Sequence, residues 1–165
     1  MSALLFLAAD FASGADDAYA RQEGQRWIIG SAKVERVVAL EDGRFILKSL
    51  GDRVTGRDLT ATAAPGDEFF FGLGSPPERL SGASGGWKLV DSQKRALTQG
   101  EIELDITLER NAVQVTRSYV VYPSSSIIRE WVTFKNSGLS PIRVIEPGFL
   151  NLSFRLGDPQ SLDVR

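Results

Sequence analysis

The chain has 165 residues, no cysteine, no histidine and a formal net charge of −2. This length suits one domain with an adequate core, and the absent residue types exclude a disulfide scaffold, a zinc site of the Cys/His kind and any catalytic triad or dyad that needs histidine. The slight negative charge argues against nucleic-acid binding, and no apolar run approaches the length of a membrane span.

The first 20 residues differ from the rest of the chain. Ala3 to Ala9 form an apolar run, and Ala18-Tyr19-Ala20 has the A-x-A form of a signal-peptidase site. Against a signal peptide, no Lys or Arg precedes the apolar run, and three aspartates interrupt the segment before the cut. Residues 1–20 are therefore either a signal peptide, which would make the protein periplasmic or extracellular, or an N-terminal extension with a strand or short helix, which leaves a cytoplasmic location open.

From residue 21 onward, short apolar runs alternate with turn residues. Residues 27–29 form a short strand, and residues 32–40 and 45–50 form two longer ones. Between these two, Asp42-Gly43 predicts a tight hairpin turn, because such turns need positive φ values that glycine adopts without strain.

An aromatic strand is predicted over residues 68–73, which include Phe69, Phe70 and Phe71. Neighbouring side chains of a strand point to opposite faces, so either both faces of this strand are covered or one ring is exposed. The Gly-, Ser- and Pro-rich residues 74–86 predict a long irregular surface loop within one domain. Trp87 follows that loop directly, so we expect its ring to be exposed.

Three long strands follow, over residues 101–109, 113–122 and 127–136, each joined to the next by a short turn. Two more strands are expected over residues 142–145 and 149–156, and residues 157–165 read as a tail or the start of a linker. About ten strands without a helix of ordinary length predict an all-β fold, a large antiparallel β-sandwich over residues 21–156.

Four carboxylates share one face of the first long strand: Glu101, Glu103, Asp105 and Glu109. Their spacing of about 7 Å resembles that of the acid pairs in glycosidases. A catalytic pair needs burial and a cleft that separate its two pKa values, however, and alternating acids on a wet strand face are common. We interpret these residues as a solvated face, with a hydrolase that uses Glu103 and Asp105 as the alternative.

Aromatic residues are the better candidates for binding. Trp87, Phe69, Phe70 and Phe71 are predicted to contact a carbohydrate or another domain, because aromatic rings offer flat apolar platforms. Trp131 lies among apolar residues on both faces of its strand and is expected in the core. The sequence contains no pattern typical of a metal or cofactor site, so neither is predicted.

Several segments resemble the N-terminal domain of α-galactosidases of glycoside hydrolase family 36. Trp27-Ile28-Ile29-Gly30 followed by Val34-Glu35-Arg36 is similar to the opening of that domain. Later segments of the same domain are matched in the same order by Leu47 to Leu50, Thr55 to Asp58, Tyr119 to Pro123 and Ile128 to Gly138. The resemblance covers residues 21–154, which is most of the chain.

The resemblance implies a β-supersandwich with the architecture of galactose mutarotases. In the family this domain precedes a (β/α)8 barrel that carries both catalytic aspartates of a retaining α-galactosidase. No β/α alternation occurs in these 165 residues, so no catalytic residue is carried over, and mutarotase chemistry relies on histidine, which is absent.

The leading hypothesis is therefore a non-catalytic domain that supports the barrel of the same parent protein and helps homo-oligomers form. The alternative is a free-standing carbohydrate-binding or adhesion β-sandwich.

Overall fold

The computed structural model describes residues 17–60 and 66–150, which form thirteen β-strands and one short 3-10 turn. The elements are β1 (Tyr19–Glu23), β2 (Arg26–Gly30), β3 (Val34–Glu41), β4 (Arg44–Asp52), β5 (Arg57–Asp58), β6 (Gly66–Asp67), β7 (Phe70–Leu73), β8 (Glu78–Ser81), η1 (Gly82–Ser84), β9 (Lys88–Ala96), β10 (Ile102–Arg110), β11 (Val113–Val121), β12 (Ile128–Asn136) and β13 (Val144–Gly148).

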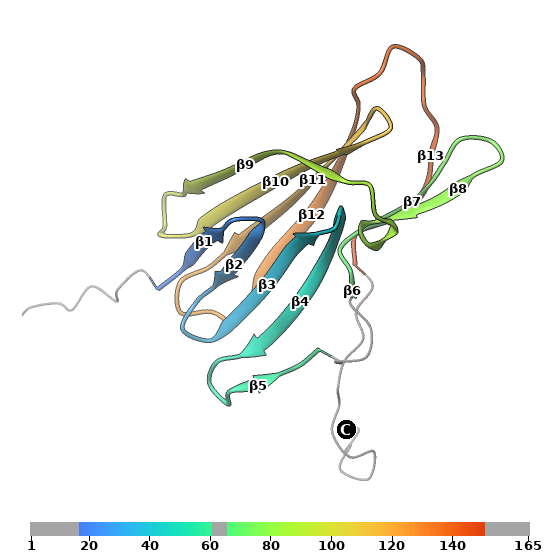
Figure 1. Ribbon diagram of the computed structural model, residues 1–165. Helices are drawn as coiled ribbons and strands as arrows, with labels where there is room; N and C mark the ends of the chain where they lie inside the picture. The colour runs from blue at the N-terminus through green and yellow to red at the C-terminus, as the bar shows by residue number, and fades with distance from the viewer. Residues whose placement is uncertain (1–16, 61–65, 151–165) are drawn as a thin grey trace, which may run out of the picture.

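These strands form three antiparallel sheets. The first sheet has the order β1-β2-β3-β4-β5 with β6 added on β4, the second has the order β12-β11-β10-β9, and the third has the order β13-β7-β8. Figure 1 shows the first and second sheets facing each other as two layers, with the third sheet beside them. The predicted all-β fold and antiparallel sandwich are confirmed.

The three long strands of the second sheet follow the predicted alternation. β10 pairs with β11 over its whole length, and β11 pairs in turn with β12. On β10 the side chains of Leu104, Ile106 and Leu108 are buried, while the residues between them are only partly covered. A period of two therefore places one apolar row of this sheet against the first sheet.

The β3–β4 hairpin also forms where the sequence predicts it. Asp42 and Gly43 have φ values of 51° and 71°, and Glu41 pairs with Arg44 across the turn. Two successive positive φ values match the right-handed twist of the strands that the turn joins.

One continuous core fills the space between the sheets. From the first sheet it includes Trp27, whose indole lies edge-on to Phe45 with 6.0 Å between ring centroids. The indole Nε1 of Trp27 donates a 2.8 Å hydrogen bond to Ser92 Oγ on β9, so the polar edge of this buried ring is satisfied by the opposite sheet.

The prediction of an irregular loop over residues 74–86 is wrong from residue 78 onward, where the chain forms β8 and η1. β8 pairs with β7 and buries Leu80, and η1 follows it directly. A strand of four residues between a Gly/Pro turn and a Gly/Ser run leaves too short an apolar pattern to be recognised from sequence.

The N-terminal boundary also needs correction. Tyr19 and Ala20 belong to β1, where Tyr19 pairs with Gly30, and both Ala18 and Ala20 lie in the core. The sandwich therefore begins at residue 19 rather than 21, and a cut after Ala20 would remove the first two residues of β1. Residues 1–16, most of the predicted strand 149–156 and the predicted tail 157–165 lie outside the described residues.

Candidate functional site

Three of the four predicted contact residues are in the core. Trp87, Phe69 and Phe71 have exposed fractions of 2%, 0% and 1%. The expectation that Trp87 is exposed is wrong, because the chain after Gly86 folds back over the β3–β4 turn, where Trp87 N–H donates to the Gly43 carbonyl at 2.9 Å.

The buried rings pack on one another. The Trp87 ring lies perpendicular to Phe69 with 5.0 Å between centroids, and its Nε1 donates to the Ser81 carbonyl at 2.8 Å. Because these rings are almost fully buried, they belong to the hydrophobic core and do not form a binding surface.

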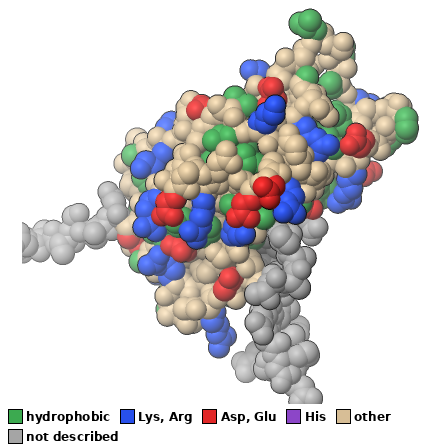
Figure 2. Space-filling model, in the orientation of Figure 1, with side chains coloured by type: hydrophobic (Ala, Val, Ile, Leu, Met, Phe, Trp, Pro, Cys, Tyr) green, Lys and Arg blue, Asp and Glu red, His purple; other side chains and the backbone are tan. Residues whose placement is uncertain are grey.

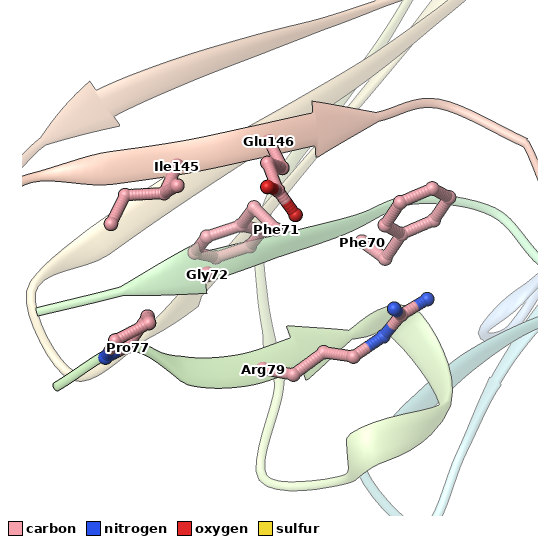
Figure 3. A pocket seen from close by; sticks show the side chains of 7 residues that line it. All are labelled: Phe70, Phe71, Gly72, Pro77, Arg79, Ile145 and Glu146. Carbon is pink, nitrogen blue, oxygen red and sulfur yellow. The ribbon is translucent and has the colours of Figure 1, made fainter.

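Phe70 differs from its two neighbours because strand alternation turns it to the opposite face of the third sheet. It lies on the same side as Gly72, and together with residues of β8, β13 and the turn before β8 it borders a cavity of about 170 Å³. We call this cavity the Gly72 notch (Figure 3); its lining residues are Phe70, Phe71, Gly72, Pro77, Arg79, Ile145 and Glu146. Of the predicted quartet, only Phe70 is therefore both partly exposed and beside a cavity.

Strand pairing explains the shape of the notch. Gly72 lies directly opposite Arg79 on β8 and Ile145 on β13. A Cβ atom at Gly72 would come within 3.3 Å of Pro77 Cβ and 3.5 Å of Ile145 Cβ. Gly72 has no side chain, so its backbone forms the floor of the notch. The side chains of Arg79 and Ile145 on either side form the walls.

Glu146 reaches the notch because of a β-bulge in β13. Ile145 pairs with Gly72 and Gly148 pairs with Phe70, so the register shifts between these pairs, where β13 has two residues and β7 has one. Glu146 has a φ of 48°, which is uncommon for a residue other than glycine. Bulges of this kind redirect a side chain, and Figure 3 shows the Glu146 carboxylate turned toward the space between Ile145 and Phe70.

Arg79 and Phe70 form the opposite side of the notch. The Arg79 guanidinium lies 4.7 Å from the Phe70 ring centroid, a cation–π arrangement. The ring also lies close to Gly148, where a Cβ atom would come within 2.2 Å of Phe70 Cζ. Only glycine at position 148 allows Phe70 to lie here.

A second group of polar residues, which the sequence did not reveal as a group, lies in the interior. It consists of Arg36 on β3, Glu68 before β7, Arg117 and Tyr119 on β11 and Glu130 on β12, and we call it the ionic network. Arg36 and Glu68 approach to 2.6 Å, Arg117 and Glu68 to 3.3 Å, and Arg36 and Glu130 to 3.5 Å. Arg117 also contacts Glu130, and the Tyr119 hydroxyl donates to Glu68.

The network stays charged although it is buried. Burial alone would raise the pKa of Glu68, but Arg36, Arg117 and the hydrogen bond from Tyr119 together hold that pKa below its usual range. Burial raises the pKa of Tyr119, and the negative charge of Glu68 raises it further, so the hydroxyl remains a hydrogen-bond donor. Two arginines and two glutamates thus balance each other beside a neutral tyrosine.

Strand alternation on β12 explains how Glu130 comes to lie in the network. Arg129 and Glu130 point to opposite faces: Glu130 enters the network, and Arg129 lies over the Trp131 ring at 5.4 Å from its centroid. Trp131 is therefore on the outer face of the second sheet and half-buried, and its expected place in the core is wrong. Glu130 pairs with the buried Tyr119 on β11, so the side chain of Glu130, and not that of Trp131, points into the protein.

The carboxylates of β10 are engaged with neighbouring side chains. Arg95 on β9 approaches Glu103 to 2.9 Å and Asp105 to 2.7 Å, and Gln114 donates to Glu109 at 2.8 Å. One guanidinium thus bridges the two acids that the hydrolase alternative requires, which favours their interpretation as a cross-strand surface pair.

The visible surface of the molecule carries charges of both signs. Lys/Arg and Asp/Glu side chains are interspersed on the face seen in Figure 2. Within residues 17–60 and 66–150, no cluster of three or more metal-binding side chains was found, and no helix is long and apolar enough to cross a membrane. Comparison with protein-family models and with curated proteins gave no significant match.

Proposed function

We propose that this chain is the non-catalytic N-terminal β-sandwich domain of an α-galactosidase-like glycoside hydrolase, and that it supports a separate (β/α)8 catalytic barrel. The proposal rests on the resemblance to family 36 and on the place of the resembling residues in the fold. One observation carries it: motif residues from distant parts of the chain meet inside the protein, in the ionic network, where they bind each other.

Arg36 comes from the Val34-Glu35-Arg36 segment and Glu130 from the Ile128 to Gly138 segment. Their side chains approach to 3.5 Å and are only 3% and 13% exposed. Charged residues that pair with one another in this way hold sheets together rather than act on a substrate. The pattern therefore supports a structural role for the motifs.

A row of core-facing side chains along β12 also supports the proposal. Ile128, Val132 and Phe134 pack against the core but remain partly exposed. Apolar area at the margin of a domain is typical of a surface that another domain covers.

The experiment has two measurements. The purified chain is incubated with nitrophenyl α-galactoside, and we expect no turnover; turnover that Glu103→Gln or Asp105→Asn abolishes would instead support the hydrolase alternative. The reading frame beyond Arg165 is then determined. A continuation that alternates strands and helices, with Asp at strand ends, supports the proposal, and an open reading frame without such a barrel contradicts it.

The alternative of a free-standing carbohydrate-binding module has less support, because three of its four predicted contact residues, Trp87, Phe69 and Phe71, are buried.

A further inference from the structure

The residue Asp17, just before β1, links the two layers at one end of the sandwich. Its carboxylate accepts two backbone hydrogen bonds: Ala32 N–H donates to Oδ2 at 2.8 Å, and Ser124 N–H donates to Oδ1 at 2.5 Å. Ala32 lies in the turn between β2 and β3 of the first sheet, and Ser124 lies in the turn between β11 and β12 of the second. Hydrogen bonds to the ionised form favour it, so these two bonds hold the pKa of Asp17 below its usual range.

A second hydrogen bond joins the same two turns. Ser31 is fully buried, and its hydroxyl donates to the Ser125 carbonyl at 2.6 Å and accepts from Lys33 N–H at 3.0 Å. We call Asp17 and Ser31, with the turn residues that they bind, the N-terminal clasp. Its partners lie 15 and 107 positions from Asp17 along the chain, so the clasp ties the start of the chain to both sheets.

Residues 18–20, which have the A-x-A form, also have defined places in the fold. Ala18 and Ala20 belong to the core, with exposed fractions of 9% and 4%. The Tyr19 hydroxyl donates to Glu35 at 2.5 Å and accepts from Arg53 at 2.8 Å. Residues two apart in a strand share one face, and β1 lies against β10 of the opposite sheet. Strand packing therefore accounts for the two small residues that also have the form of a signal-peptidase site.

We propose that residues 17–20 stay in the mature protein, where the N-terminal clasp locks the two layers together, and that N-terminal processing does not take place after Ala20. A cut there would remove Asp17 from both turns and Tyr19 from its pairing with β2. Ser31 would be the remaining link of the clasp. Processing is therefore confined to positions before Asp17. This inference goes beyond the support role and holds whether or not a barrel follows the domain.

The first test identifies the N-terminus of the folded protein. The full chain is expressed with its own N-terminus in a bacterium that carries a signal peptidase, and the intact mass and N-terminal sequence of every folded species are measured. We expect each species to contain Asp17, whether it is uncut or cut before that residue. A folded species that begins at Arg21 would overturn the inference.

The second test breaks the clasp in the full chain. In Asp17→Ala, the amide hydrogens of Ala32 and Ser124 should exchange with solvent about tenfold faster or more, because each loses a hydrogen bond to a charged group. The two amides belong to turns of different layers, so a joint change identifies the carboxylate that binds both. Unchanged exchange at these two amides would contradict the clasp.

Asp52→Ala is the matched control. The Asp52 carboxylate also accepts two backbone hydrogen bonds, from Val54 N–H at 2.9 Å and Thr55 N–H at 3.2 Å, but both donors lie within its own turn. Its loss should speed exchange at Val54 and Thr55 and leave the amides of Ala32 and Ser124 as they are in the unaltered protein. Faster exchange at all four amides in both variants would mean that the loss of any carboxylate loosens the fold, which would also overturn the inference.

The third test compares the product of the disputed cut with the chain that keeps the clasp. A protein that starts at Arg21 and one that starts at Asp17 are unfolded in urea, and we expect the shorter protein to have the lower midpoint or no folded state. Equal midpoints would show that the fold does not need residues 17–20. The support role fails separately, through turnover by the isolated chain or a reading frame without a barrel, and neither result changes these measurements.

Discussion

Glu68 joins side chains of both layers in the interior of the sandwich. It is fully buried, and its carboxylate accepts from Arg36, Arg117 and Tyr119. Taking a carboxylate out of water is costly, and only close cations and donors offset that cost. The two arginines come from different sheets, so one glutamate side chain joins both layers.

Glu68→Gln should destabilise the protein by about 3–5 kcal/mol, because it leaves two buried guanidinium groups with one carboxylate between them. Equilibrium unfolding in urea measures this change. Glu41→Gln is the control: Glu41 pairs with Lys48 at 3.0 Å on the surface, and such pairs contribute about 0–1 kcal/mol. Equal effects of the two substitutions would show that the network does not hold the sheets together.

The lowered pKa of Glu68 also predicts how stability depends on pH. A carboxyl whose pKa is lower in the folded state contributes stability above its unfolded pKa of about 4.3 and loses that contribution as the pH falls through the folded pKa. The groups that face Glu68 are Arg36, Arg117 and Tyr119, and Glu130 contacts the same two arginines.

We therefore expect the free energy of unfolding to fall on acidification below about pH 4.3, and to fall less steeply in Glu68→Gln. Urea midpoints measured between about pH 3 and 7 for both proteins provide the comparison. Identical slopes would contradict the assignment of the lowered pKa to this residue.

At the residue scale, sequence reasoning reached only part of these findings. Alternation predicted that the neighbouring rings of Phe69, Phe70 and Phe71 face opposite sides of their strand, with one ring exposed unless both sides are covered. It could not predict Glu68, which precedes three phenylalanines in an ordinary strand pattern. The burial of Glu68 follows from contacts with residues 32 to 51 positions away, and no local pattern records such contacts.

At the scale of elements, the hairpins are the most predictable parts of the fold. Asp42-Gly43 indicates both the turn and its backbone conformation, and the structure confirms it. What the turn touches was not predictable: a Cβ atom on Gly43 would lie 2.8 Å from the backbone nitrogen of Gly86. Gly43 thus serves the hairpin and also the close approach of the segment that leads to Trp87.

Substitution of Gly43 by alanine can separate these two roles. Gly24 in the β1–β2 turn has a similar φ of 63°, and a Cβ atom added there would have no atom within 4 Å, whereas Gly43 has a φ of 71° and the contact with Gly86. Both Gly→Ala changes carry the cost of a positive φ, about 1–2 kcal/mol. We expect Gly43→Ala to lower the free energy of unfolding in urea by at least about 1 kcal/mol more than Gly24→Ala, which is the usual cost of overpacking. Equal effects would mean that residues 85–87 move aside without a cost in stability.

The third sheet is the element-scale arrangement that sequence could not supply. Its strands β7, β8 and β13 are short, and β13 is more than 60 residues beyond β8 along the chain. The notch exists only because Gly72, Arg79 and Ile145 become cross-strand neighbours. Pairing between distant short strands is set by tertiary packing rather than by local propensity.

At the scale of the whole molecule, the class of fold follows from the sequence and the assembly of its layers does not. Strand periodicity and turn spacing predict an antiparallel sandwich, and the long strands of the second sheet appear where expected. The same periodicity gives no information on which strands face each other across the core. It also misled on Trp131, because apolar residues on both faces of β12 allow two inward directions, and the register with β11 decides between them.

The ionic network affects how the two layers align with each other. Its charges alternate around a closed square: Arg36, Glu68, Arg117 and Glu130 each have an opposite charge on either side. Sliding one layer against the other would bring like charges together where water cannot screen them. The apolar rows on either side are held by an attraction without direction, so the paired charges oppose such a slip more specifically than the rows do. The square therefore selects a single alignment of the two layers and rejects the neighbouring ones.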